Sequence, residues 1–562
     1  MSRRTRRLAL VAVCALAAAP LTLASVATAA PQPITPVEWT RTVLTTDVVD
    51  PTDLDVAPDG AVVIAERTGA VKVWKQDGTL KTAGKIPVSA NASLLEPGEE
   101  LEEGGIHGLL LDRTFLKTRK VFAYYSVPNS VDDKTGEGLF RVSTFTLSKD
   151  YVLDLKSAKT ILEVPVEWAN CCHYGGDMEW MKDGTILMTV GDDTSPRDEG
   201  WNPRDKRKGR EAFNAERTSQ NKKDRRGKVL RFNPDGSVPK NNPHVRDKSY
   251  DPYVYAMGFR SDYRMGHDQV TGATFVGNVG PDARNADAAR GPQGFDELET
   301  IPAKGGTNHG WPRCIGDNKP YMDYDYATGT TKGPLSCKGM TPATIWYDYN
   351  YSAEFPLVAS GTRTHMAGPI YRSAGKGALA LPESFNGKLI HWDWSRGIAF
   401  ATPVNADGTL DTASLTPWSA AVPNTFVSAG GAVPVGGPSA PMDMVVGPDG
   451  ALYVAEYGSG YYNNTNSAVS RISCFQCTPD ARDYAGSPVV KKDAGVEQRP
   501  VVQTAGVRAA SNGSAVVVVP AGDVLAATGG ALSLAGVGAL LALTAVLVRR
   551  RSSAGAPDAS GL

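Results

Sequence analysis

Short runs of alternating apolar and polar residues, each entered through an Asp-Gly turn, recur along the middle of this 562-residue chain. An Asp-Gly pair between apolar runs is a strong signal for a β-hairpin turn. The three clearest runs are Asp59-Gly60 before residues 61–67, Asp183-Gly184 before residues 185–190, and Asp449-Gly450 before residues 451–457. The pattern therefore predicts a strand after each of these turns.

Related turns occur at Asp235-Gly236 and Asp407-Gly408, whereas long amphipathic helical patterns are scarce. Degenerate hairpins at wide, irregular spacing favour an all-β fold, a β-propeller with long loops. A β-sandwich is the alternative architecture. We assign the propeller to residues 38–478 as one domain, since a single large all-β domain can have this length.

The first 30 residues have the order of an export signal. Four arginines precede the apolar run from Leu8 to Leu21, and small residues follow it before Pro31. This order of charge, apolar run and cleavage site predicts that the chain leaves the cytoplasm. Both the Sec and the twin-arginine routes fit the arginines.

The C-terminal region has two parts. Residues 479–524 are poor in aromatic side chains and carry scattered charges, which predicts a disordered spacer. Within residues 525–562, the pentapeptide that contains Leu525, Thr528 and Gly529 precedes an apolar stretch at 531–548 and three arginines.

This arrangement resembles the sorting signal of Gram-positive cell-wall proteins. The resemblance implies that a sortase cleaves after Thr528 and joins the chain to peptidoglycan. The alternative is a plain transmembrane anchor, since about 18 apolar residues can span the hydrocarbon core. In both cases we expect an exported protein at the cell wall or membrane, with its folded part on the extracellular face.

Charge and cysteine content narrow the partners. A formal net charge of −1 gives no electrostatic reason to expect nucleic acid. Beyond Cys14 in the export signal, an even set of cysteines in an exported chain predicts disulfides. They are Cys171, Cys172, Cys314, Cys337, Cys474 and Cys477. Proximity favours Cys314 with Cys337 and Cys474 with Cys477. The last pair could instead bind zinc, and Cys171 and Cys172 could form a vicinal ring or remain separate.

The most informative segment for chemistry runs from Cys171 to Asp193. It places His173 beside two glycines, and a strand-like stretch then leads to two aspartates. A neutral imidazole can take a proton, and a carboxylate on its other nitrogen fixes the tautomer. We therefore predict His173 as a general base with an orienting acid, the alternative being a structural histidine.

Several blocks, in order, resemble the soluble glucose and sorbosone dehydrogenase family of quinoprotein propellers, which includes the aldose sugar dehydrogenases. The blocks are residues 103–108, 227–236, 255–260, 277–282, 296–297 and 305–312. The resemblance implies a six-bladed propeller that binds pyrroloquinoline quinone (PQQ) and Ca²⁺ in its upper face. It also implies oxidation of an aldose or related alcohol to a lactone, with an electron acceptor that the sequence does not identify.

The resemblance also assigns roles to individual residues. His173 matches the histidine that takes the hydroxyl proton, Asp192 matches its orienting acid, and Arg260 matches a cation beside the quinone oxygens. Glu103 and Ser261 stand where the family has cofactor-contacting glutamine and asparagine. Gly280 and Pro281 match residues whose carbonyls hold the cofactor's calcium, and Asp296 with Glu297 matches a carboxylate region around a structural calcium.

One departure from the family bears on the cofactor. Residues 440–442 are Ala-Pro-Met where the family has an Arg-x-Arg clamp for the carboxylates of the quinone. Arg363 and Arg396 are the candidate replacement cations. Two other functions therefore remain open: a non-catalytic propeller that binds carbohydrate or another extracellular partner, and a calcium-dependent lactonase.

Overall fold

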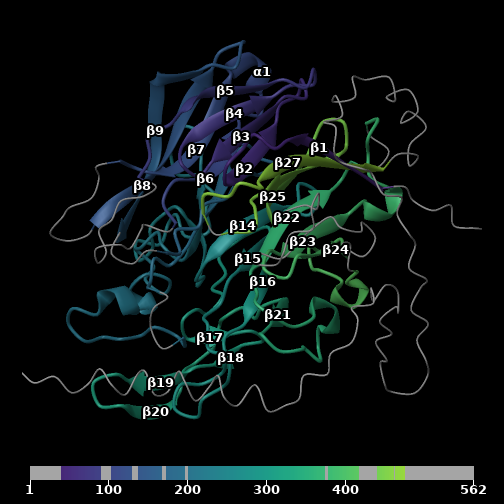
Figure 1. Cartoon of the computed structure of the whole chain (residues 1–562). Helices are drawn as coiled ribbons and strands as arrows, with labels where there is room; N and C mark the ends of the chain where they lie inside the picture. The colour runs from purple at the N-terminus through teal and green to yellow at the C-terminus, as the bar shows by residue number, and fades with distance from the viewer. Residues whose placement is uncertain are drawn as a thin grey trace, which may run out of the picture. The chain divides into compact units, whose positions relative to one another are not determined.

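The computed structural model describes residues 39–89, 103–128, 137–167, 172–195, 200–373, 377–416, 440–460 and 462–474. The chain divides into two units, Met1–Gln498 and Arg499–Leu562, and every described residue belongs to the first. Within it, five four-stranded sheets and one three-stranded sheet form the blades of a six-bladed β-propeller (Figure 1). The all-β propeller expected from the sequence is confirmed.

Each of the first three blades is a four-stranded antiparallel sheet. Blade 1 comprises β2 (Pro51–Val56), β3 (Val62–Glu66), β4 (Ala70–Trp74) and β5 (Leu80–Lys85). Blade 2 comprises β6 (Ile106–Leu111), β7 (Lys120–Ser126), β8 (Glu137–Leu147) and β9 (Leu153–Glu167). Blade 3 comprises β10 (Met178–Trp180), β11 (Ile186–Val190), β12 (Lys228–Phe232) and β13 (Val254–Met257).

The last three blades are less regular. Blade 4 comprises β14 (Asp262–His267), β15 (Thr274–Asn278), β16 (Asp296–Ile301) and β21 (Ile345–Tyr347). Blade 5 comprises β22 (His365–Tyr371), β23 (Lys388–Asp393) and β24 (Ile398–Pro403). Blade 6 comprises β25 (Pro441–Val446), β26 (Leu452–Glu456), β27 (Ala468–Cys474) and the N-terminal strand β1 (Trp39–Thr45).

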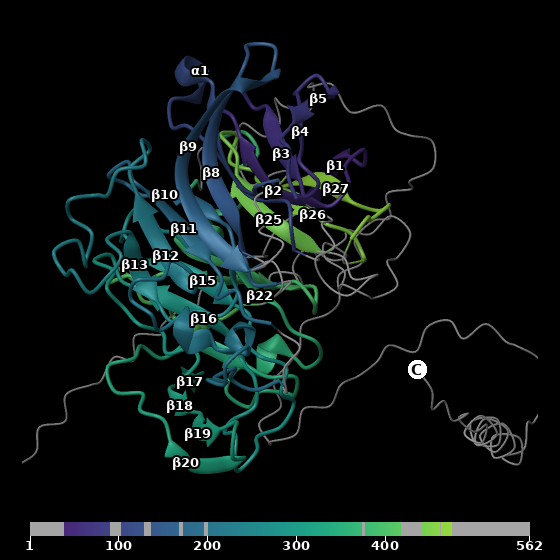
Figure 2. The same ribbon diagram turned by 90° about the vertical axis from the view of Figure 1, so that its left-hand side faces the viewer.

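The helices in the described part of the chain are short and lie between strands. They are α1 (Phe115–Thr118), η2 (Glu211–Phe213), η3 (Ala215–Arg217), η4 (Pro356–Val358), η5 (Glu383–Phe385) and η6 (Thr412–Ser414). Between β16 and β21, two small hairpins are inserted: β17 (Cys314–Ile315) with β18 (Lys319–Pro320), and β19 (Met322–Asp325) with β20 (Thr330–Pro334). In Figures 1 and 2 this insertion lies at the opposite end of the view from α1.

None of the described helices is long and apolar enough to cross a membrane. The expected signal peptide (1–30), spacer (479–524) and apolar stretch (531–548) lie outside the described residues, and so do Leu525, Thr528 and Gly529. The expectations attached to them stay predictions.

The three strands expected after Asp-Gly turns are all second strands of blades: β3, β11 and β26. Gly60, Gly184 and Gly450 have φ of 82°, 85° and 82°, a left-handed conformation that glycine adopts without a steric penalty. All the residues of these three strands are buried, so each strand packs on both faces, as expected for neighbouring blades.

The first strand of each blade faces the axis, and these strands contact one another in a closed ring. Its order is β2, β6, β10, β14, β22 and β25. The ring is closed by pairing of the two ends of the folded region, because β1 runs antiparallel to β27 from Trp39 opposite Cys474 to Thr45 opposite Val469. Arg41 on β1 also forms a two-pronged ion pair with Glu456 on β26.

Aspartates link neighbouring inner strands by accepting backbone N–H groups. Asp443 accepts from Leu54 at 3.2 Å, and Asp53 accepts from Leu109 at 2.8 Å. Asp177, just before β10, accepts from Met265 on β14 at 2.7 Å. These bonds tie blade 6 to blade 1, blade 1 to blade 2, and blade 3 to blade 4.

Arg264 on β14 extends across the axis to three other inner strands. Its Nε donates to the Met442 carbonyl at 2.9 Å, its Nη1 donates to the His107 carbonyl at 3.3 Å, and its Nη2 donates to the Thr52 carbonyl. Burial would lower the pKa of Arg264, but the charges of Asp53, Asp177 and Asp443 outweigh it and raise that pKa. Burial in turn raises the pKa of Asp53 and of Asp177, that of Asp177 to about 6, while the Arg264 charge opposes the rise. A single cation therefore offsets the negative charge of three buried carboxyl groups.

We expect Arg264→Met to destabilise the propeller by about 3–5 kcal/mol in urea unfolding, because it leaves buried carboxylates without their cation. An aspartate whose folded-state pKa is raised favours folding when protonated, so its contribution falls as pH rises through that pKa. The variant raises these pKa values further, and its deficit should be larger at about pH 7.5 than at about pH 5. Arg264→Lys, which keeps the charge, should reduce this difference. An equal deficit at both pH values would contradict the role of the cation.

Candidate functional site

The structure brings together the histidine and the acid that the sequence singled out. His173 Nδ1 lies 2.9 Å from Asp192 Oδ1, and both side chains are buried. His173 has φ of 67°, in the left-handed region that a non-glycine residue seldom adopts. Such a conformation persists only where the surroundings determine it, and these positions cluster at functional sites.

The turn after β11 holds His173 in place. A Cβ added to Gly191 would lie 2.1 Å from the His173 carbonyl oxygen, so only glycine allows the two segments to approach this closely. On either side of that contact, the Asp193 N–H donates to the His173 carbonyl at 3.2 Å and the Asp192 N–H donates to the Arg260 carbonyl at 2.7 Å. The turn therefore positions His173 and Arg260 together.

Asp192 is fully enclosed by donors. Its carboxylate accepts from the Thr194 N–H at 3.0 Å, from the Thr194 hydroxyl at 2.8 Å and from the Trp311 indole at 2.7 Å. Burial alone would raise the pKa of Asp192, but the hydrogen bond and charge of His173 and the charge of Arg260 outweigh it. The pKa is held below its usual value, so Asp192 is an anion that accepts the His173 Nδ1–H. In the neutral imidazole this tautomer leaves the opposite nitrogen, Nε2, without a proton, so that Nε2 can act as a base.

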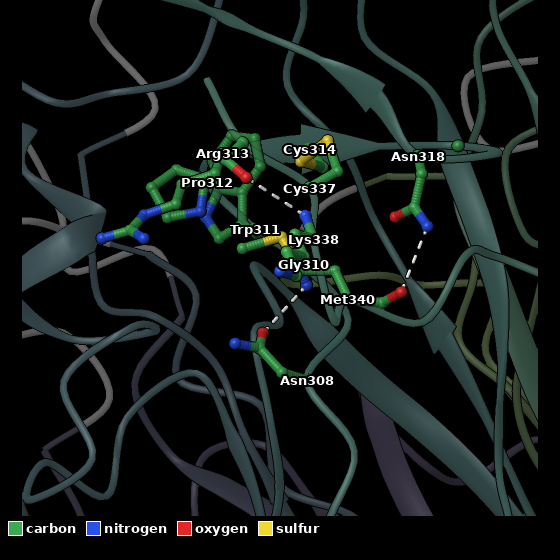
Figure 3. Close-up of a disulfide and its surroundings, with 12 residues drawn as sticks. Asn308, Gly310, Trp311, Pro312, Arg313, Cys314, Asn318, Cys337, Lys338 and Met340 are labelled. Atoms are coloured by element: carbon green, nitrogen blue, oxygen red, sulfur yellow. Dashed lines mark hydrogen bonds between the residues drawn. A yellow bond between two sulfur atoms is a disulfide. The ribbon is translucent and has the colours of Figure 1, made fainter.

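A disulfide anchors the segment that carries Trp311. Cys314 bonds to Cys337, as predicted, and the Cys314 N–H donates to the Gly310 carbonyl at 3.1 Å. Figure 3 shows this disulfide beside the turn from Gly310 to Arg313. The disulfide closes a loop that contains β18, β19 and β20, and it fixes the chain three residues after Trp311.

Cys172 and Cys474 are also disulfide-bonded. Cys171 and Cys477 lie outside the described residues, so the vicinal ring and the Cys474–Cys477 pairing remain predictions. No group of three or more His, Cys, Asp or Glu side chains in the described part of the chain is arranged to hold a metal ion.

The side chain of Glu103 contacts the backbone of His173. Its Oε2 accepts the His173 N–H at 2.7 Å. Burial raises the pKa of Glu103, although the charge of His173 and this hydrogen bond oppose the rise. The structure thus gives Glu103 a role in holding the His173 loop, next to the role as a cofactor contact that the resemblance implied.

Arg260 lines a small pocket with free space of about 10 Å³, enough for about one water molecule. We call it the Arg260 pocket; its walls include Thr194, Ser195, Trp201, Arg260, Pro281 and Asp282. Arg260 Nη1 donates to the Val279 carbonyl at 3.0 Å, and the guanidinium lies 5.9 Å from the Trp311 ring centroid. The Trp201 indole Nε1 is buried without a hydrogen-bond partner among the described residues. The pocket thus has a fixed cation on its wall.

Ser261 is beside this pocket and does not line it. Its N–H and that of Arg260 both donate to the Asn278 side-chain oxygen at 3.1 Å. Ser261 therefore helps to fix the backbone of Arg260, and the described contacts give its hydroxyl no role in a cofactor site.

The two carboxylates expected in the region of a structural calcium do not converge. Asp296 and Glu297 are consecutive on β16, so their side chains point to opposite faces of the blade. Asp296 pairs with Arg363, whereas Glu297 accepts from the Gly316 N–H at 2.5 Å and from Asn278 at 3.0 Å. Strand alternation thus separates the two carboxylates, and the structural calcium expected near them stays a prediction.

Gly280 and Pro281 also have other partners. The Gly280 N–H donates to Asp296 at 3.0 Å, and the Pro281 carbonyl accepts from Arg363. The same guanidinium therefore contacts both Pro281 and Asp296.

The absent arginine clamp is replaced by apolar packing. Ala440 and Met442 are buried in the core of blades 5 and 6. Arg396, one candidate replacement, donates to the carbonyls of Asp348, Val358 and Thr362, so its guanidinium binds loop backbone. Arg363, the other, is bound to Asp296 and Pro281.

Sequence reasoning missed three contributors to the site. Trp311 and Thr194 complete the shell of Asp192, and Trp201 lines the Arg260 pocket. Thr194, two residues after Asp192, fits a local Asx turn, a signal that the sequence carries. Trp311 and Trp201 come from distant loops, and no local pattern links either to β11.

Comparison with solved structures agrees with the fold. A putative oxidoreductase (glucose dehydrogenase) of Thermus thermophilus has a TM-score of 0.50 at 20% identity, covering 77% of this chain and 100% of that one. The apo form of the soluble aldose sugar dehydrogenase of Escherichia coli has a TM-score of 0.51 at 18% identity, covering 78% and 100%.

Sequence comparison extends this to the family. Quinoprotein glucose dehydrogenase B of Acinetobacter calcoaceticus is 25% identical over 343 residues, 58% of this chain and 62% of that protein. An uncharacterized protein of Synechocystis is 27% identical over 294 residues, 51% of this chain and 62% of that protein. The match thus spans less than two thirds of these relatives. Residues 48–353, more than half of the chain, match the glucose/sorbosone dehydrogenase family. The chain belongs to the glucose/sorbosone dehydrogenase family.

Proposed function

We propose that this protein is a quinoprotein dehydrogenase that oxidises an aldose sugar or a related alcohol to its lactone, with PQQ as cofactor. The observation that carries the proposal is the buried pair of His173 and Asp192, at 2.9 Å, beside the turn that also fixes Arg260. Membership of the glucose/sorbosone dehydrogenase family supports the reaction class. The relatives named as glucose dehydrogenase and aldose sugar dehydrogenase support the substrate class.

The residues around the Arg260 pocket suit a planar anionic quinone better than they suit a metal. Arg260 offers a fixed cation, and Thr194, Ser195 and Trp201 lie on the pocket wall. The donors expected for calcium do not fit that ion, because Arg363 already binds Pro281 and Asp296. We therefore propose that the quinone binds beside Arg260, in a space larger than this pocket, and derive no step through calcium.

The protein's own groups account for the proton. When bound, PQQ supplies the acceptor for the hydride that leaves the substrate carbon. His173 Nε2 takes the proton of the substrate hydroxyl, so the C–H and O–H bonds break and a carbonyl forms. Asp192 holds the Nδ1–H and stabilises the imidazolium that results. Arg260 offers positive charge where negative charge develops in the pocket.

We further propose that the propeller works outside the cytoplasm, held at the cell wall or the membrane. The export-like N-terminus and the Leu-Ala-Ala-Thr-Gly segment with its apolar stretch support this location. Sortase and peptidoglycan are the partners that the sorting-type signal implies.

The activity is tested by titrating the purified full chain with PQQ and following dye reduction over a panel of aldoses. We expect saturable binding and aldose-dependent reduction. His173→Ala and Asp192→Asn should each lower kcat by about 10²–10⁴-fold, because each removes part of the base, while PQQ binding is retained.

His244→Ala is the matched control, since His244 stacks on Tyr250 at 3.7 Å in a loop that contributes nothing to the pocket. It should leave the rate unchanged. Absence of PQQ binding in wild type would overturn the dehydrogenase proposal and favour a propeller that binds carbohydrate without turnover. Dye reduction that survives His173→Ala would remove His173 from the base role.

Trp311→Phe tests the shell of Asp192. It removes the indole donor but keeps an aromatic ring, so the pKa of Asp192 should rise toward its usual value. A depressed aspartate pKa stabilises the fold above the unfolded-state pKa, and this stability is lost as pH falls through the folded-state pKa. The variant should therefore lose more stability at neutral pH than below about pH 4, as measured by urea unfolding.

Trp392→Phe provides the comparison, because the Trp392 indole donates at 2.8 Å to a neutral acceptor, the Pro441 carbonyl. Its stability deficit should be the same at both pH values. A pH-independent deficit in Trp311→Phe as well would mean that the indole does not stabilise the Asp192 charge.

A further inference from the structure

The guanidinium of Arg363 lies where the resemblance to the family leads one to expect metal ions. Its Nη1 donates to Asp296 and its Nη2 donates to the Pro281 carbonyl. The side chains of Arg363 and Asp296 are 1% and 0% exposed, so the ion pair is closed to solvent. A single side chain thus contacts one oxygen ligand expected for the cofactor's calcium and one expected for a structural calcium.

The remaining oxygens of this cluster are also occupied. Asp296 Oδ1 accepts the Gly280 N–H at 3.0 Å as well, and Oδ2 accepts the His365 N–H at 2.9 Å. Ca²⁺ requires six to eight oxygen ligands at about 2.3–2.6 Å, usually with several carboxylates. Asp296 faces N–H donors on both oxygens, and a bound guanidinium would repel a divalent cation at this distance.

Packing leaves no room for a metal beside the guanidinium. A Cβ added to Gly294 would lie 1.6 Å from the Pro281 carbonyl oxygen and 2.7 Å from Arg363 Nη2. On another side, the guanidinium carbon lies 4.4 Å from the Tyr349 ring centroid. Arg363 is therefore held by an anion, a carbonyl and an aromatic face, which together satisfy a guanidinium.

Glu297 does not supply the carboxylate ligand that Asp296 cannot offer to a metal ion. It lies on the opposite face of β16, and Glu299, two residues along the same strand, is its acidic neighbour. The Glu297 carboxylate accepts from the Gly316 N–H at 2.5 Å and from the Asn278 side chain at 3.0 Å.

We propose that Arg363 is a built-in cation that replaces calcium between Pro281 and Asp296, so that this chain binds no metal ion there. Pro281 forms part of the wall of the Arg260 pocket, and Arg363 is thus a positioning residue for that wall. The proposal concerns only the occupant of this position. It stands whether or not the protein oxidises sugars.

The test uses Tb³⁺ as a luminescent substitute for Ca²⁺, on the full chain after treatment with a chelator. Tyr349 lies close enough to the position to sensitise a bound Tb³⁺. Wild type and Asp296→Asn should give the same Tb³⁺ signal. Ca²⁺ binding between Pro281 and Asp296 should make no contribution to the Tm of wild type. Arg363→Gln vacates the space while keeping a polar side chain, and it should gain both a Tb³⁺ signal and a Ca²⁺-dependent rise in Tm of at least ~2 °C.

Two further variants identify the position. Arg363→Lys keeps the positive charge and should gain neither response. Arg363→Gln combined with Asp296→Asn lacks the carboxylate and should lose the gain. A Tb³⁺ signal in wild type that Asp296→Asn abolishes would overturn the proposal, and this comparison holds even where Arg363→Gln does not fold.

Discussion

The arrangement of this propeller depends on how one buried guanidinium is balanced by carboxyl groups at the axis. Inner strands from different blades meet there, and each has backbone groups that the strand ladders do not satisfy. Asp53, Asp177 and Asp443 accept N–H groups from neighbouring blades. Arg264, on blade 4, donates to carbonyls on the inner strands of blades 1, 2 and 6. Carboxylates this close would repel one another without the cation. The blades are therefore registered by charge as well as by apolar packing.

The candidate site depends on this registration. His173 precedes β10, Asp192 follows β11 and Arg260 precedes β14, so the site spans the junction of blades 3 and 4. Asp177 bonds the start of β10 to Met265 on β14 across the same junction. A relative movement of these two blades would change the distance between His173 and Arg260. The charge network at the axis thus contributes to the geometry of the site although it contacts none of the candidate catalytic atoms.

Much of the fold could be predicted from local signals. The Asp-Gly turns identify β3, β11 and β26, because a turn that requires left-handed glycine is written in two residues. The nearness of His173 and Asp192 could also be anticipated, since a single hairpin separates them. Contacts between distant loops could not: nothing near Arg363 in the sequence indicates that it binds Asp296, and nothing near Trp311 indicates Asp192. The motif that matches Asp296 and Glu297 as a pair does not show that strand alternation turns their side chains to opposite faces.

The pairing of β1 with β27 has a consequence for the order of folding. Arg41 and its partner Glu456 are separated by 415 positions, so blade 6 cannot be completed until almost the whole propeller has been synthesised. Blades 1 to 5 are each built from consecutive segments and can form as the chain emerges. β1 must wait as an unpaired strand, and long-range pairing of this kind is slow and exposes strand edges. The blades thus form in the order of the chain, and the ring closes last, when β27 pairs with β1.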